Sequence, residues 1–324
     1  MTRALSPLLL VAALLGGCGG GNDADPQTTA VDPATLCVAS ACGVKTQLLD
    51  IPSAENTLFT PQGRLFVTGS DSVYEITHDA AGWHATALAD TAANFTGLAQ
   101  RGDVIYAAAF DGNLYAARLS DTPPAFKAIH ALGVSAANGM TTDAGGVLYI
   151  INGPLGGALP DPKIIRLRFD AADPMKVTEQ TNWLTSGLSF PNGLQHRGNT
   201  LVFSDSDALS VTLGAIRTVE IQADGSAGPV KTLGTFPSLP DDLGLVGDSV
   251  LAAFYSNGQI GLINAAGVLV SQTDPLSFQN PSSVKLGQPP LFAADDLIVT
   301  EKGVVALPPT PGYGSKLSVF RRKS

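Results

Sequence analysis

The chain is poor in cationic residues and in histidine, and each shortage narrows what the protein can be. Lys and Arg total 19 against 28 Asp and Glu, which leaves a formal net charge of −9. Because contact with a phosphate backbone needs clustered positive charge, this composition argues against a nucleic-acid partner. The histidines do not recur at the spacing of a metal site, so we expect them at the surface. They are His78, His84, His130 and His196.

Several catalytic and membrane motifs are also missing. The sequence contains no Gly-x-Ser-x-Gly elbow, so a serine-hydrolase triad is unsupported. Its glycine-rich segments lack the Lys-Ser/Thr ending of a phosphate-binding loop. Beyond the first 17 residues, no apolar run approaches the roughly 20 residues of a membrane-spanning helix. The hydrophobic content of 44% is nevertheless enough for a substantial core.

The start of the chain has the layout of a secretory signal peptide, over residues 1–17. Arg3 provides a positive charge, and a short apolar run from Leu8 to Leu15 ends in small residues. Leu15 to Cys18 resemble the bacterial lipobox; the alternative is an ordinary signal peptide with a chance cysteine. The resemblance implies that Cys18 is lipidated and becomes the mature N-terminus, with enough acyl chains for stable anchoring. In a Gram-negative organism, Gly19 in place of an aspartate then implies the outer membrane, with the protein facing the periplasm.

The two remaining cysteines form an even pair. Residues 18–43 would comprise the lipidated cysteine, a flexible Gly-rich tether and the segment from Cys37 to Cys42. In an oxidising compartment this pair favours a disulfide that closes a small loop. The alternative, a metal site, would need further ligands, and no histidine lies nearby in the sequence.

From about residue 44 the sequence predicts an all-β domain. Short runs rich in Val, Ile, Leu, Tyr and Phe alternate with turn residues, and no long stretch has helical periodicity. Asp111-Gly112 lies between two such runs and is typical of a β-hairpin turn.

A repeat with a period of about 45 residues underlies these runs, and this period is typical of propeller blades. Each unit combines Asn, Asp, Ser or Thr with a following Leu, Met or Val. The units begin at Ala54, Asn94, Ala137, Pro191, Pro240 and Pro281. They predict a six-bladed β-propeller over residues 44–324, with blades at 53–90, 91–131, 132–187, 188–237, 238–276 and 277–324.

Closing such a ring needs a strand from the other end of the chain. We expect Val44 to Leu49 to complete the last blade beside Leu317 to Phe320. A large β-sandwich or a β-helix is the alternative. A sandwich does not explain the recurring unit, and β-helix repeats are much shorter.

In a propeller, equivalent positions on the innermost strands converge on the central axis. Those positions carry mainly carboxylate, amide and hydroxyl oxygens, which suit a calcium-like ion. They are Glu55, Asn94 or Thr96, Asn138, Asn192, Asp241, and Ser282 or Ser283.

Here the chain resembles the senescence-marker-protein/gluconolactonase family, which includes regucalcin, and more loosely the strictosidine-synthase and paraoxonase propellers. The motifs that carry the resemblance are Ser53-Ala-Glu55, Asn138-Gly, Pro191-Asn-Gly-Leu194 with Leu201-Val-Phe-Ser-Asp205, and Pro240-Asp241. The resemblance implies that Glu55, Asn192 and Asp241 bind a divalent metal. Calcium is the favoured ion, with zinc and manganese as alternatives. It also implies that Asn138 contacts the substrate or the metal. We take Asn138 as a substrate-binding residue and add Asn94 and Asp242 as further substrate-binding candidates.

Two departures from the family pattern bear on the substrate. Ala136 stands where the sugar-lactone enzymes have an arginine, which makes gluconolactone itself doubtful. Asp242 replaces the usual glycine and adds a carboxylate. No glutamate in the last blade matches the catalytic one of strictosidine synthases; Glu301 is only a distant candidate.

Two functions follow from the sequence. The first is a metal-dependent hydrolase of a lactone or ester, in which Asp241 positions a metal-bound water or acts as general base. The second is a non-catalytic propeller lipoprotein that binds a ligand or scaffolds envelope proteins. For the hydrolase we expect a small-molecule substrate, a membrane contact through the lipid anchor, and a monomer.

Overall fold

A computed structural model describes residues 31–153, 161–207, 213–304 and 312–323. The predicted signal peptide, the lipidation residue Cys18 and the first part of the tether lie outside the described residues, as does most of the segment between Gly153 and Lys163. Within the described ranges, no helix has the length and apolar character needed to cross a membrane.

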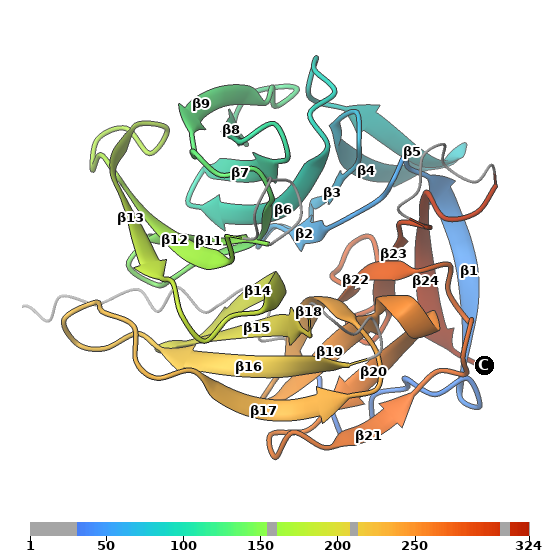
Figure 1. The fold of residues 1–324 in the computed structure, drawn as a ribbon. Coiled ribbons are helices and arrows are strands. Elements are labelled where there is room, and N and C mark those ends of the chain that lie inside the picture. Colours follow the sequence, from blue (N-terminus) through green and yellow to red (C-terminus); the bar gives the residue numbers. More distant parts are fainter. Residues whose placement is uncertain (1–30, 154–160, 208–212, 305–311, 324) are drawn as a thin grey trace, which may run out of the picture.

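The chain folds into six four-stranded antiparallel sheets arranged in a ring (Figure 1). Blade 1 contains β2 (Thr57–Phe59), β3 (Leu65–Thr68), β4 (Val73–Asp79) and β5 (Gly82–Ala87). Blade 2 contains β6 (Phe95–Arg101), β7 (Val104–Ala109), β8 (Asn113–Arg118) and β9 (Lys127–Ala131). Blade 3 contains β10 (Ala137–Thr142), β11 (Leu148–Asn152), β12 (Lys163–Phe169) and β13 (Val177–Leu184).

The second half of the chain repeats this plan. Blade 4 contains β14 (Phe190–Arg197), β15 (Thr200–Ser206), β16 (Gly214–Glu220) and β17 (Lys231–Phe236). Blade 5 contains β18 (Pro240–Val246), β19 (Ser249–Phe254), the 3₁₀ turn Tyr255–Asn257, β20 (Gln259–Ile263) and β21 (Leu269–Gln272). Blade 6 contains β22 (Pro281–Leu286), β23 (Leu297–Glu301), β24 (Lys316–Arg322) and β1 (Gly43–Asp50). The all-β, six-bladed propeller predicted from the sequence is therefore confirmed.

The ring is closed by the first strand of the domain. β1 pairs antiparallel with β24 from Gly43 opposite Arg322 to Asp50 opposite Lys316, so the last blade holds both ends of the fold. In Figure 1 this strand lies along the outer edge of blade 6. Pairing strands from opposite ends of the chain holds the ring shut with backbone hydrogen bonds.

The hydrophobic core is divided into six clusters, one between each pair of neighbouring blades. β7 shows how one strand serves two of them. Tyr106 packs toward blade 3, whereas Ile105 and Ala107 pack toward blade 1. Successive side chains of a strand point to opposite faces, and both faces are covered here. This explains why the strands read as continuous apolar runs instead of alternating ones.

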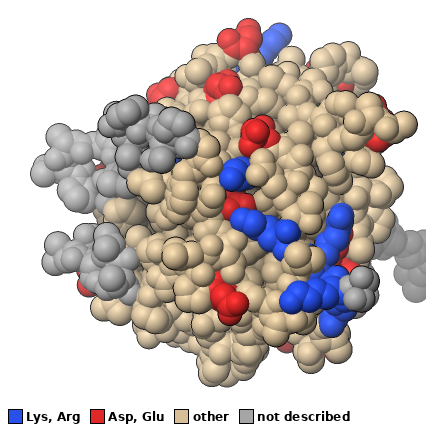
Figure 2. Space-filling view, turned by 90° about the vertical axis from the view of Figure 1, so that its right-hand side faces the viewer, with Lys and Arg blue, Asp and Glu red and all other residues tan. Residues whose placement is uncertain are grey.

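The segment that precedes β1 packs against blade 6. Cys37 and Cys42 form a disulfide there, and Leu36 and Val38 join the cluster between blades 5 and 6. Lys323 Nζ donates to the Ser40 carbonyl at 2.9 Å. Figure 2 views this side of the molecule, where basic side chains gather. The strands β1 and β24 and the residue that follows them contribute Lys45, Lys316, Arg321, Arg322 and Lys323.

Candidate functional site

The recurring Asn or Asp of the sequence repeat lies in a β-bulge on the innermost strand. In β10, the pairing with β11 shifts between Ala137 and Met140. β14 and β18 shift in the same way after Pro191 and Pro240. A bulge adds one residue and redirects a side chain. It thus gives Asn138, Asn192 and Asp241 equivalent positions at the hub of the ring.

Neighbouring bulges pack directly against one another. A Cβ on Gly139 would lie 2.4 Å from the Asn192 carbonyl oxygen, and a Cβ on Gly193 would lie 2.5 Å from Asp242 Cα. Only glycine fits this contact, so the Asn-Gly pairs of the repeat are explained in part by backbone packing. Asp242 replaces that glycine in blade 5, and its side chain becomes part of the hub.

Hydroxyl groups of the preceding blade fix the backbone of Asp241 and Glu55. Ser204 Oγ accepts from the Gly193 amide at 2.7 Å and donates to the Asp241 carbonyl at 2.5 Å. Thr300 Oγ1 donates to the Glu55 carbonyl at 2.8 Å. Hydrogen bonds of this kind place two carboxylates from different blades on rigid backbone.

Glu55 precedes β2, and its carboxylate is almost fully buried. It forms an ion pair with Lys302, which follows β23 directly and keeps 15% of its side chain exposed. The two residues are 247 positions apart in the sequence. Lys302 was not predicted as a site residue. The only signal was its position after a strand that ends on the face of the ring where the innermost strands begin.

Asp241 lies close enough to Glu55 and Lys302 for its ionisation to depend on both. Burial and then the negative charge of Glu55 raise the pKa of Asp241 well above its usual range. The Lys302 ammonium and a hydrogen bond from Asn192 act in the opposite direction. We call Glu55, Asn192, Asp241 and Lys302 the hub cluster. The structure thus brings together the three residues predicted to bind metal.

The hub cluster can accept a cation. It contains two buried carboxylates but one ammonium, and Asn192 Oδ1 is buried without a hydrogen-bond partner in the described structure. Within the described residues, no three His, Cys, Asp or Glu side chains come together as a metal site. The donors are therefore two carboxylates and one amide oxygen, a hard-oxygen set that fits a calcium-like ion.

Asp242 has different partners from Asp241, although the two are adjacent. Its carboxylate accepts from Lys285 Nζ at 2.8 Å and from Asn56 Nδ2 at 3.0 Å, and all three side chains are buried. These partners already occupy the carboxylate of Asp242, and its role in substrate binding stays a prediction.

A cavity of about 730 Å³ opens at the end of the channel formed by the later parts of the innermost strands. Asn56, Gln195 and Lys285 line it, and all three contact Asp242. The residues of the hub cluster do not line this cavity, but Asn56 directly follows Glu55 and Asp242 directly follows Asp241.

The other residues predicted for the site, Asn138 and Asn94, differ in their position relative to the bulges. Asn138 is half-buried in the bulge of blade 3. Asn94 is exposed and lies outside the equivalent bulge, which contains Thr96 instead. The Thr96 hydroxyl donates to the Ala137 carbonyl at 2.8 Å. Of the two sequence alternatives for blade 2, Thr96 therefore has the matching register. The role of Asn94 in substrate binding stays a prediction.

The Glu301 side chain is held by partners within its own blade. Its fully buried carboxylate pairs with Lys45 at 3.1 Å and accepts from Ser318 Oγ at 2.6 Å. This carboxylate joins β23 to the two outer strands of blade 6, which explains its burial without a catalytic role.

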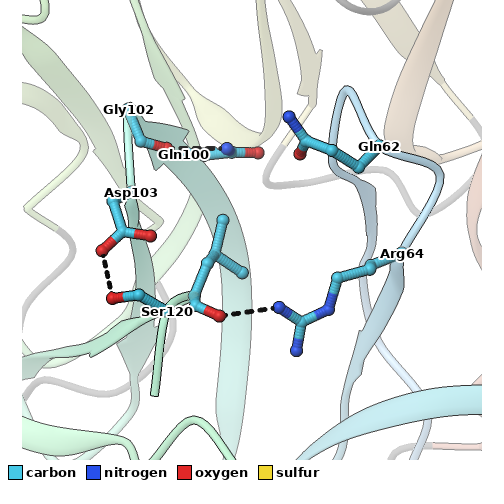
Figure 3. Close-up of a pocket in the computed structure, with 7 residues that line it drawn as sticks. Gln62, Arg64, Gln100, Gly102, Asp103 and Ser120 are labelled. Atoms are coloured by element: carbon cyan, nitrogen blue, oxygen red, sulfur yellow. Dashed lines mark hydrogen bonds between the residues drawn. The ribbon is translucent and has the colours of Figure 1, made fainter. Parts of the chain in front are cut away.

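A second pocket, of about 400 Å³, lies between blades 1 and 2, away from the hub cluster (Figure 3). Several of its polar groups pair with one another, but the buried Gln100 Oε1 has no hydrogen-bond partner in the described structure. Arg64 donates to the Leu119 carbonyl at 2.9 Å, and Ser120 Oγ donates to Asp103 at 2.6 Å.

Comparison with known proteins identifies the architecture. No protein-family model matches the chain, and no curated protein matches it. Solved structures do. Regucalcin from Agrobacterium tumefaciens, a calcium-binding protein, superposes with a TM-score of 0.61 at 15% identity, covering 84% of this chain and 90% of its own. A luciferin-regenerating enzyme gives 0.62 at 16% identity, with 87% and 95% covered. This chain has the regucalcin-like propeller fold.

The same fold is also found in streptogramin B lyase, which superposes with a TM-score of 0.56 at 11% identity over 89% of this chain and all of its own. These similarities are too distant to transfer an activity. The regucalcin-like fold supplies the ring and the converging strands, and the function must come from the side chains at the hub.

Proposed function

We propose that the hub cluster is the active centre of a hydrolase that acts on a lactone or an ester with the help of a divalent cation. The observation that carries the proposal is the convergence of Glu55 and Asp241, buried beside one ammonium and the unpaired Asn192 Oδ1. Two buried carboxylates in one place need compensating positive charge, from a proton or a cation. The calcium-binding regucalcin of similar fold supports calcium as the ion, with zinc and manganese as alternatives.

In this proposal Glu55, Asn192 and Asp241 hold the cation. The ion supplies Lewis acidity toward a carbonyl oxygen and lowers the pKa of water. Asp241 receives a proton from water at its carboxylate, a role favoured by burial and the neighbouring Glu55, which raise the pKa of Asp241. The half-buried Asn138 orients the substrate carbonyl from the adjacent bulge.

One observation favours the second function, a ligand-binding propeller without catalysis. Ala136 is buried at the position where the sugar-lactone enzymes have an arginine, so that donor to a polyol is missing. A substrate with fewer hydroxyl groups, such as a simple ester or an alkyl lactone, is compatible with both this absence and the hydrolase.

Hydrolysis assays decide between the two functions. Phenyl acetate and γ-butyrolactone are offered to the chelator-treated protein with calcium, zinc or manganese restored separately. We expect turnover that depends on the ion and falls at least about 100-fold in Asp241→Asn, because a general base contributes at least this factor. Asp121→Asn, a change at an exposed turn, is the matched control and should keep full activity. Activity that ignores both the chelator and Asp241 would reject the proposal.

We also propose that the propeller is a monomer held at the cell envelope by lipid on Cys18, facing the periplasm from the outer membrane. The tether would leave the domain beside the basic end of β24, where Lys323 contacts Ser40. In Triton X-114 partitioning, we expect the full chain in the detergent phase and Cys18→Ser in the aqueous phase. Equal partitioning of the two forms would contradict the anchor.

A further inference from the structure

Lys302 places its ammonium group in the candidate cation site, paired with Glu55. We infer that Lys302 is a tethered competitor of the divalent cation for Glu55 and thereby sets the affinity of the hub for that cation. This inference rests on the proposed function, because it assumes that Glu55, Asn192 and Asp241 can hold a cation.

The backbone around Lys302 is firmly held. Its amide donates to the Asn280 carbonyl at 3.1 Å, and the next residue, Gly303, accepts from Tyr255 Oη at 2.7 Å. The position of Lys302 Cα is therefore fixed, and its flexible stem carries the ammonium to Glu55 Oε2. A lysine delivered from a rigid strand end to a ligand oxygen acts as an intramolecular cation at high effective concentration.

An ammonium and a divalent cation cannot share the same carboxylate oxygen, since like charges at this distance repel strongly in a buried site. Binding of the ion must then release Lys302 from Glu55. Lys302 can leave, because 15% of its side chain already reaches solvent.

Lys285 provides the contrast within the same hub. Only 4% of its side chain is exposed, and it is held by both Asp242 and the Leu243 carbonyl. Lys285 is therefore a fixed counter-ion, whereas Lys302 is an exchangeable one. The two lysines have the same chemistry but different freedom to move.

Calcium titration by calorimetry tests the inference on the full folded chain. We expect Lys302→Met to bind calcium at least tenfold more tightly than the wild type, because the competitor is gone. Lys302→Arg keeps the charge and should remain near the wild-type affinity. Lys231→Met removes an exposed lysine that is paired with Glu220 in blade 4, and it should change nothing. The double variant Glu55→Gln/Lys302→Met should lose the gain.

Thermal unfolding gives a second readout. Without calcium, Lys302→Met should melt below the wild type, because Glu55 and Asp241 lose their only ammonium in the hub cluster; calcium should reverse this difference. If Lys302→Met does not fold, Lys302→Gln takes its place with the same expectations. A calcium affinity in the neutral variant no tighter than in the wild type, including no binding by either, overturns the inference.

The two proposals fail in different ways. If no ester or lactone is hydrolysed but Lys302→Met gains calcium affinity, the hydrolase is rejected and the competition stands. If the wild type hydrolyses its substrate with calcium and Lys302→Met shows no gain, the competition is rejected and the hydrolase stands.

Discussion

Asp241 and Asp242 are adjacent at the centre of the propeller, yet their carboxylates have opposite electrostatic environments. The bulge of β18 directs both carboxylates into the hub, but Asp241 meets a second carboxylate while Asp242 meets Lys285. One aspartate therefore lies in an environment that disfavours its charge, and the other lies in a satisfied ion pair. Strongly perturbed ionisation of this kind is typical of functional sites, whereas a satisfied pair is typical of structural ones.

This contrast predicts opposite effects on stability. Asp242→Ala should lower the free energy of unfolding by about 3–5 kcal/mol, because it leaves the buried Lys285 without its charge partner. Asp241→Asn should leave stability unchanged or raise it, because it removes repulsion with Glu55. Urea unfolding of the metal-free protein measures both values. A larger loss in Asp241→Asn than in Asp242→Ala would contradict these assignments.

Buried tyrosines predict the alkaline limit of the fold. Burial raises the pKa of Tyr106 and of Tyr149 to about 12 in each case. The folded state thus retains both protons while the unfolded chain ionises near pH 10. Their contribution to stability is complete below pH 10 and is lost between about pH 10 and 12. Tyr149→Phe should lose stability less steeply over this range, as measured by unfolding at several pH values. If the variant lost stability with pH as steeply as the wild type, Tyr149 would have to be solvent-exposed in the folded protein.

At the scale of the strand, the bulge is the element on which the site depends. Four innermost strands, β6, β10, β14 and β18, carry it at the same point. Each of the first three bulges rests on the next through a glycine, and in blade 5 Asp242 stands at that position. The sequence repeat is therefore required first of all by backbone packing between neighbouring blades. The polar side chains that it directs inward are available for chemistry as a consequence.

Gly139→Ala should destabilise the protein by about 3 kcal/mol, because the added methyl group would overlap the Asn192 carbonyl. Gly102→Ala is the control. Its Cβ would meet open space, and the cost of about 1 kcal/mol comes from the left-handed backbone alone. Chemical denaturation compares the two variants. Equal losses would show that the bulges do not pack as tightly as described.

Strand-level patterns explain what could be predicted from the sequence. The 45-residue period predicted six blades, and the pairing of β1 with β24 was predicted from the need to close the ring. Local pattern could not decide between Asn94 and Thr96, because the place of the bulge in β6 is seen only from its pairing with β7. Nor could it predict Lys302 or Lys285, because each pairs with a carboxylate on another blade and no local spacing encodes that contact.

The whole molecule is held together by closure of the ring more than by its covalent crosslink. The disulfide joins residues only five positions apart, so it removes little entropy from the unfolded chain. β1, in contrast, covers the edge of β24 along its full length.

Loss of the disulfide and loss of β1 should differ sharply in their effects on stability and on cooperative unfolding. Replacing Cys37 and Cys42 with serine should cost about 2 kcal/mol and preserve cooperative unfolding. Starting the chain at Ile51 removes β1 and leaves β24 as an open edge, which favours association with other chains. We expect that form to lose cooperative unfolding and to oligomerise. Scanning calorimetry and gel filtration test both forms, and a monomeric, cooperative protein without β1 would contradict the role of closure.

The most direct measurement of the central claim is the position of a cation in the folded protein. Crystals grown with manganese as an anomalous scatterer should show one strong peak in contact with carboxylate oxygens of Glu55 and Asp241 and with Asn192 Oδ1, and Lys302 should point away from Glu55. A hub without a peak at saturating manganese, with Lys302 still paired to Glu55, would contradict the account.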